Sequence, residues 1–309
     1  MGDTLPAPFP GQAYVTVSPI NGGQITLPER SFVSPSGDAA VTVPSLSFLI
    51  THPGTGSETK PRYLLFDLGL RAKLGDYMKE QRNHLESRRP YVLGPGVAQW
   101  LRHGGIDPAD IDTVILSHIH YDHHGDPAEF SNAKFWVGAG SLNVLKDGLG
   151  ISASHQFFDP DLFRNTTEVN EFPPPDTPSW RAVGPFEAVL DFLGDGSVYV
   201  VDAPGHLPGH INLLCRVAPA KWMYLGGDSC HDVRLLTGER QIATWADAHG
   251  NTRCIHVDKD RAEETLSRIR ELMQTKGDEV EVVMAHDVQW WNRNRHRAIG
   301  MGGVKSTRI

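Results

Sequence analysis

The sequence has few cysteines, no long apolar run and no excess of positive charge. Its three cysteines, Cys215, Cys230 and Cys254, show no CxxC spacing, so we do not expect a disulfide scaffold. No apolar stretch approaches the ~20 residues that span a bilayer. Lys and Arg number 29 against 37 Asp and Glu, a net charge of -8, which does not suit the binding of nucleic-acid phosphates. We therefore expect neither nucleic-acid nor membrane partners.

The N-terminal segment 1–11 lacks a basic stretch followed by an apolar one, so no secretory signal is expected and the predicted location is cytoplasmic. The chain has 309 residues, enough for one large domain or two ordinary ones. Because we find no repeat and no linker, we predict a single domain over residues 1–309. The segment near 150–180, which contains three consecutive prolines, is expected to be an irregular insertion.

Short apolar runs rich in β-branched residues predict strands in both halves of the chain. The predicted strands are 14–17, 41–50, 63–66, 113–116, 135–137, 188–192, 198–201, 211–217, 222–225 and 281–284. Apolar residues at helical spacing predict helices over 95–103, 141–146 and 258–274, the last capped by Asp258. Strands with helices between and after them indicate an α+β fold of two packed sheets flanked by helices.

Side chains that can bind metal ions follow the end of the predicted strand 113–116. The run Leu116 to Asp126 contains four histidines and two aspartates. His118 and His120 are two positions apart, so an extended backbone points both side chains the same way. Asp122 and His123 follow where the chain must turn. Imidazole and carboxylate together suit zinc, and also admit iron or manganese.

One loop cannot complete two metal sites, and three further candidates follow the ends of predicted strands. His206 comes after the strand 198–201, Asp228 after the strand 222–225, and His286 after the strand 281–284. Ligands at the tips of rigid strands are well positioned for metal binding.

These residues resemble the metallo-β-lactamase superfamily. The motif His118-x-His120-x-Asp122-His123-x-Gly125 is similar to the central signature of that family, and the segments around the three later candidates are similar to its later motifs. The turn at Asp67 is similar to the family's early aspartate motif. The resemblance runs from about residue 40 to 290 and implies a four-layer αβ/βα sandwich.

The resemblance also implies roles for these side chains. His118, His120 and His206 would bind one zinc ion; Asp122, His123 and His286 would bind a second; Asp228 would bridge the two. Asp67 would fix the tautomer of a ligand imidazole. Asp122 would also transfer a proton to the leaving group. Outside the ligand set, His210 is interpreted as a structural hydrogen-bonder, His124 as lining the pocket or exposed, and Cys230 as a small buried residue.

The activity that the resemblance implies is hydrolysis of a small carbonyl substrate, in which a hydroxide held between two metals attacks the carbonyl carbon. The sequence motif at residues 203–210, which contains His206, is most similar to that of the lactonase branch, whose members open cyclic esters. That branch carries a tyrosine three residues after the bridging aspartate; here the residue is His231, a second catalytic candidate that could donate to an oxyanion.

Other functions stay open from the sequence. A lactam or cyclic carbamate hydrolase differs only in the leaving atom, and Arg293, Arg295 and Arg297 keep a glyoxalase-II-like thioesterase in consideration. A non-enzymatic metal-stabilised binding protein is disfavoured because every ligand position is filled. The sequence does not indicate an oligomeric state. The residues expected to contact substrate are Tyr121, Phe157, Phe158, His231, Trp290 and Trp291.

Overall fold

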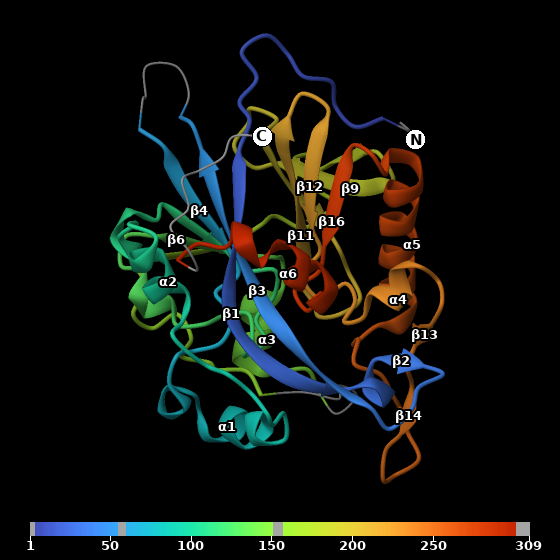
Figure 1. Cartoon of the computed structure of the whole chain (residues 1–309). Helices are drawn as coiled ribbons and strands as arrows, with labels where there is room; N and C mark the ends of the chain where they lie inside the picture. The colour runs from blue at the N-terminus through green and yellow to red at the C-terminus, as the bar shows by residue number, and fades with distance from the viewer. Residues whose placement is uncertain (1–3, 55–59, 151–156, 301–309) are drawn as a thin grey trace.

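A computed structural model describes residues 4–54, 60–150 and 157–300 and contains two six-stranded sheets that pack face to face (Figure 1). The first sheet has the order β1 (Thr16–Pro28), β3 (Ala40–His52), β4 (Arg62–Phe66), β5 (Thr113–Ile115), β6 (Lys134–Val137), β7 (Glu168–Glu171). The second has the order β16 (Val280–Val283), β12 (Lys221–Leu225), β11 (Ile211–Ala218), β10 (Val198–Asp202), β9 (Phe186–Asp191), β8 (Arg181–Val183). Two short pairs accompany them: β2 (Val33–Ser34) with β13 (Gln241–Ile242), and β14 (Trp245–Ala246) with β15 (Thr252–Arg253).

Strand alternation sorts the apolar side chains into three cores. On β4, Leu64 and Phe66 face the other sheet, whereas Leu65 faces the helices outside the first sheet. On β12, Met223 faces inward and Trp222 faces outward. Each sheet is therefore apolar on both faces, which is why both need a helical cover.

The helices form the two outer layers (Figure 1). α2 (Val97–His103) and α3 (Ser141–Asp147) pack on the first sheet, and α5 (Lys259–Lys276) packs on the second. α5 begins at Asp258, whose side chain accepts from Arg261 N, and buries Leu266, Ile269 and Leu272. The predicted four-layer sandwich is confirmed. Three further helices are α1 (Lys79–Glu86), α4 (Val233–Leu236) and α6 (Val288–Asn294).

Several boundaries differ from prediction. The first strand is far longer than 14–17, because β1 continues through a bulge between Asn21 and Gln24, where Gly22 and Gly23 hid the strand pattern. The segment near 150–180 is not irregular throughout: β7 pairs in parallel with β6 and extends the first sheet. Residues 151–156 of that segment lie outside the described ranges. The helices α1 and α6 were not predicted.

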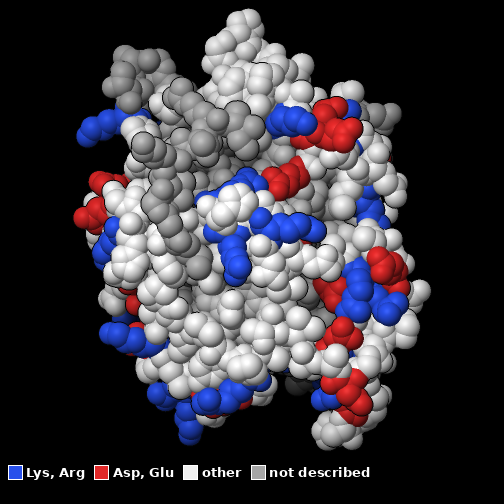
Figure 2. All heavy atoms as spheres, viewed as in Figure 1, with Lys and Arg blue, Asp and Glu red and all other residues white. Residues whose placement is uncertain are grey.

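The basic stretch 292–297 lies at the surface, where α6 ends. Arg293 and Arg295 are exposed, and Arg297 pairs with Glu281 at 3.2 Å. Figure 2 shows positive side chains gathered on this face around α6. Among the described residues, no helix combines the length and apolarity needed to cross a bilayer.

The two sheets bring the ends of five strands to one place. β4 and β5 run parallel in the first sheet, and β10, β12 and β16 share one direction in the second. Backbone bonds join the two edges: Ile211 N donates to Ser117 O at 2.9 Å, and Leu46 N donates to Ala285 O at 2.9 Å. The loops that follow these five strands therefore meet at one edge of the sandwich.

Candidate metal centre

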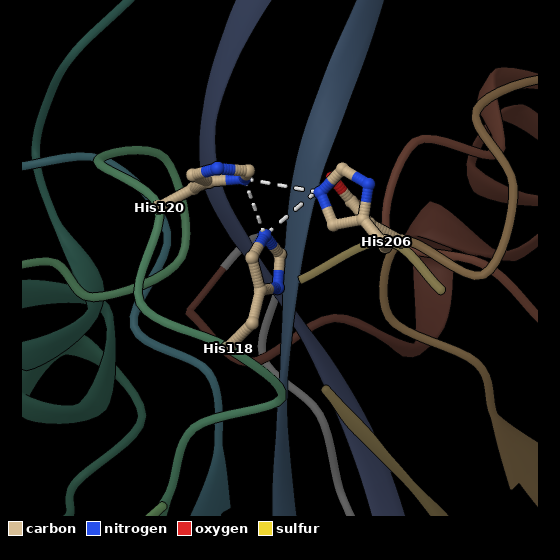
Figure 3. A group of neighbouring side chains, drawn as sticks. His118, His120 and His206 are labelled. Carbon is tan, nitrogen blue, oxygen red and sulfur yellow. Dashed lines mark hydrogen bonds and ion pairs between the residues drawn. The ribbon is translucent and has the colours of Figure 1, made fainter. Parts of the chain in front are cut away.

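Three buried imidazoles converge at this edge (Figure 3). His118 and His120 lie in the loop after β5, and His206 lies in the turn after β10. His118 Nε2 is 2.9 Å from His120 Nδ1, and His206 Nε2 is 3.0 Å from that same His120 nitrogen. Three ring nitrogens from two sheets thus face one point.

The protonation state of these three rings determines whether a cation can bind between their nitrogens. Burial lowers the pKa of His120 to about 3, and it lowers the pKa of His118 and His206 well below the ordinary value. All three rings are therefore neutral near pH 7. A neutral imidazole carries one ring proton, so each converging nitrogen offers a lone pair whenever that proton sits on the other ring nitrogen. Such a donor set fits a cation such as zinc.

A second group lies beside the first and contains Asp122, His123 and His286. One ligand-type atom from each of the three lies within 4.8 Å of the others. His286 Nε2 is 3.6 Å from Asp122 Oδ2. This is a mixed nitrogen and oxygen donor set, again of the kind that divalent metals prefer.

Asp228, in the turn after β12, lies between the two groups. Its Oδ1 is 3.2 Å from His123 Nε2 and 3.3 Å from His286 Nε2. Its Oδ2 is 3.5 Å from His206 Nε2 and 3.7 Å from His118 Nε2. Burial raises the pKa of Asp228, but the imidazoles of His123 and His286 lower it by a larger amount. The net pKa of Asp228 therefore lies well below the usual range. A buried, ionised carboxylate faces one group with each oxygen.

His123 Nε2 and Asp228 Oδ1 lie 3.2 Å apart, but neither atom makes a well-directed hydrogen bond to any described residue. A buried polar atom without a partner costs free energy, about 1–3 kcal/mol. A metal ion bound between these atoms would remove that cost. The residues present therefore fit a metal centre.

A second layer of hydrogen bonds holds the imidazoles in place. Asp67 Oδ2 lies 2.9 Å from His123 Nδ1, and its carboxylate also accepts from Ser117 N at 2.7 Å and from Ser117 Oγ at 2.8 Å. His286 Nδ1 lies 2.7 Å from Pro44 O. These acceptors keep a proton on Nδ1 and aim Nε2 at Asp228. Burial lowers the pKa of His123, but the carboxylates of Asp228 and Asp67 raise it by more, so that its net pKa lies well above the ordinary value.

His210 positions Asp228 through the backbone. Its Nδ1 lies 2.9 Å from Ala203 O, and its Nε2 accepts from Asp228 N at 3.0 Å. Burial lowers the pKa of His210 to about 4, which keeps it neutral for this double role. The preceding Gly227 has φ of +46°, and a Cβ there would lie 2.9 Å from Ser117 Cβ. Glycine is needed at this turn. The expected structural role of His210 is confirmed.

A cavity opens over the two groups. It is lined by Ile25, Leu27, Phe32, His84, Arg88, His120, Tyr121, Asp122, His206, Asp228, His231, Ile255 and His286. The cavity is partly open, and its volume of about 20 Å³ holds roughly one water molecule. Only the reacting end of a ligand can lie between the side chains, and the rest must contact the rim.

His231 projects into this cavity from the loop after β12. Its Nε2 is 2.9 Å from Asp228 Oδ2, and its ring stacks on His286 with centroids 5.5 Å apart. Phe158 stacks on His120 at 5.7 Å, whereas Phe157 packs on His84.

Some predicted contacts are wrong. Trp290 and Trp291 are buried in the core between the sheets, because α6 packs its apolar side there. His124 is neither exposed nor beside the cavity: it is buried, with Nε2 3.4 Å from Gln81 Nε2. Cys230 is buried, as expected.

Three site residues were not predicted. His84 and Arg88 come from α1 and the turn that follows it, and no motif marks them. His256 is fully buried beside His206 and His231, with ring centroids 5.1 and 5.6 Å away, and neither of its ring nitrogens has a hydrogen-bond partner among the described residues. Its one sequence signal was a histidine between two apolar residues, Ile255 and Val257.

Solved structures share this fold. The chain superposes on an N-acyl homoserine lactone lactonase described as quorum-quenching with a TM-score of 0.62 and 16% identity, covering 94% of this chain and 95% of that chain. At this identity the likeness concerns the fold alone.

Curated relatives are closer in sequence. The cytochrome P450 monooxygenase mpaDE of Penicillium brevicompactum is 30% identical over 90% of this chain and 34% of its own length. The chain thus spans about a third of the length of that relative. The gamma-lactamase FDB1 of Fusarium pseudograminearum is 32% identical over 66% of this chain and 50% of its own length. The N-acyl homoserine lactonase AttM of Rhizobium radiobacter is 31% identical over 41% of this chain and 44% of its own length.

The family model of the metallo-beta-lactamase superfamily matches residues 43–226, more than half of the chain. That range includes the loop after β5, the turn bearing His206 and most of both sheets. The expected family, and with it the assignment to a superfamily of hydrolases, is confirmed. This chain belongs to the metallo-β-lactamase superfamily.

Proposed function

We propose that the chain is a hydrolase with two zinc ions that opens a small cyclic ester, a lactone. His118, His120 and His206 would hold one ion, Asp122, His123 and His286 the other, and Asp228 both. The observation that carries the proposal is the placement of Asp228, with Oδ1 toward one group and Oδ2 toward the other. Iron or manganese would suit the same donors.

When bound, zinc supplies Lewis acidity and brings the pKa of a water molecule near 7. Around it, two of the protein's own residues would act on the substrate. Asp122 faces the cavity beside His286 and can accept a proton, then deliver it to the leaving oxygen. His231 can turn its Nε2 proton toward the carbonyl oxygen when Asp228 binds metal instead.

The walls of the cavity favour a small, partly apolar ring. Ile25, Leu27, Phe32 and Ile255 contribute apolar surface close to the metal-ligand candidates. Excluding water around the reacting carbonyl strengthens every electrostatic contact inside. The three C-terminal arginines do not line this cavity in the described structure, which removes the reason for a thioesterase that accepts an acidic thiol conjugate.

A lactam is the second candidate substrate, and a specific observation favours it. The gamma-lactamase relative matches 66% of this chain, whereas the homoserine lactonase relative matches 41%. The attack on the carbonyl is the same for both, but the leaving nitrogen of a lactam needs a proton more than the leaving oxygen of a lactone. The residue that would supply it is Asp122.

The test is hydrolysis by protein of measured metal content, before and after chelation. The panel contains homoserine lactone, γ- and δ-lactones, a γ-lactam, a benzoxazolinone-type carbamate and a glutathione thioester. Chelator-sensitive opening of the lactones, with about two metals per chain, is the expected result. Faster hydrolysis of the lactam or carbamate would assign the enzyme to amide-type bonds instead of esters. Two bound metals without any turnover would favour a binding protein.

A further inference from the structure

We propose that Arg88 binds a carboxylate carried by the substrate, so that the preferred substrates are anionic cyclic carbonyl compounds. This inference rests on the proposed function and names its substrate class. Arg88 lines the same cavity as Asp122 and His231, and its side chain is half-buried. Among the described residues that line the cavity, it is the one lysine or arginine.

Two backbone hydrogen bonds fix the position of Arg88. Its nitrogen donates to Leu85 O at 2.9 Å in the last turn of α1, and its carbonyl accepts from Thr26 N of β1 at 3.0 Å. The residue is therefore tied both to the helix and to the long strand that supplies Ile25 and Leu27 to the cavity wall. Because these bonds fix the backbone of Arg88, less backbone freedom is lost when its side chain binds a ligand.

The charge of Arg88 has no carboxylate partner within ion-pair distance among the described residues. Its neighbour Arg89 differs: it points to solvent and pairs with Glu86 at 2.5 Å. Arg88 instead donates through Nε to His84 Nε2 at 3.4 Å and hydrogen-bonds Tyr121. Burial and the nearby guanidinium lower the pKa of His84 to about 4, so this partner is neutral. Arg88 is left with its positive charge uncompensated.

A carboxylate matches this environment. A guanidinium presents parallel N–H groups that bind both oxygens of a carboxylate, and it is weakly hydrated, so it suits a half-buried wall. The carboxylates that line the cavity, Asp122 and Asp228, belong to the candidate metal groups. A ligand with its carbonyl at the metal centre and its anionic group against Arg88 would satisfy both.

The experiment compares two lactones that differ by one carboxylate: γ-butyrolactone and 5-oxotetrahydrofuran-2-carboxylate. The same comparison for lactams uses 2-pyrrolidinone and 5-oxoproline. Arg88→Gln should lower kcat/KM for the anionic member about ten- to a hundredfold, the usual effect of losing a charged hydrogen bond. It should leave the neutral member within about twofold. Arg88→Lys should recover part of the loss.

Arg89→Gln is the matched control, because it removes the same charge one residue away on the solvent side. It should change neither substrate. Metal content and thermal unfolding of each variant identify a folding defect. Equal kcat/KM for the charged and neutral probes in the wild type, or an equal loss on both in Arg88→Gln, would overturn the assignment.

A binding measurement separates this inference from the proposed function. The hydrolysis product of the anionic lactone is 2-hydroxyglutarate, and that of γ-butyrolactone is 4-hydroxybutyrate. If no probe is turned over, the proposed function fails, but calorimetric titration with these two acids still tests Arg88. Tighter binding of 2-hydroxyglutarate that Arg88→Gln abolishes supports the inference, and equal affinities refute it.

Discussion

Replacing Asp67 by asparagine tests the proposed metal centre with little change of shape. Asp67 has φ of 61°, a left-handed conformation that asparagine also adopts readily. The amide oxygen can still accept from Ser117 N, which lies 2.7 Å from Oδ1. The new NH₂ group, however, replaces Oδ2, which lies 2.9 Å from His123 Nδ1. An acceptor for the imidazole proton thus becomes a donor.

This change should move the ring proton of His123. With a donor beside Nδ1, the favoured tautomer carries its proton on Nε2, the nitrogen that faces Asp228. A protonated nitrogen cannot bind a metal. Losing a partner of a ligand histidine typically weakens metal affinity about 10–100-fold, or about 1.4–2.8 kcal/mol. The group with His118, His120 and His206 should be affected less, because Asp67 contacts it only through Ser117.

The assay is metal binding in competition with a chromophoric chelator, which resolves two binding steps per chain. In Asp67→Asn, the metal affinity of one of these two binding steps should decrease. Asp126→Asn is the control, since it removes a carboxylate from the same loop that only caps Ala128 N at 3.1 Å. Burial raises the pKa of Asp67 despite His123, and thermal unfolding of the metal-free variants identifies a folding defect. Two steps of wild-type affinity in Asp67→Asn would refute the reasoning.

Three further predictions use the same protein. Asp228→Ala should lose at least one metal per chain by elemental analysis, and two metals with full activity would remove its bridging role. His231→Ala should lower turnover with metal content intact; loss of zinc would make His231 a ligand. Asp202→Asn tests a half-buried carboxyl beside Arg261 and Arg268, in a small cavity that Glu187 and Glu264 also line. Burial raises the pKa of Asp202 from 3.8 to about 6, so the folded state prefers the protonated form and its ionisation above pH 6 costs about 3 kcal/mol. Denaturant unfolding should find the variant more stable by about that amount at pH 8 and no different below pH 4; a difference independent of pH would contradict this.

The sequence predicted most of the sandwich because its strands are short and buried on both faces. Runs such as that of β10, with Val198, Val200 and Val201, carry a strong local signal. The candidate ligands were equally visible, since they follow strand ends directly. The hidden elements had weak local patterns: β1 contains Pro19, and β7 is a polar edge strand with the sequence EVNE.

The cavity wall was less predictable, because tertiary packing creates it. His84 and Arg88 belong to a helix whose sequence reads as an ordinary polar surface. They reach the cavity only because the turn after α1 bonds to β1. Conversely, Trp290 and Trp291 follow a ligand candidate closely in sequence, yet α6 turns them into the core. Distance along the chain was a poor guide to distance from the centre.

The candidate ligands are divided between the halves of the molecule. Each group combines residues of the loop after β5 with a residue from a loop of the second sheet, His206 in one and His286 in the other. A bound ion would therefore act as a crosslink between the sheets, and its binding energy would count toward their cohesion. At free metal a thousandfold above Kd, mass action adds about 4 kcal/mol to folding stability. Chelation should accordingly do more than stop chemistry: it should loosen the seam along which the two sheets are joined.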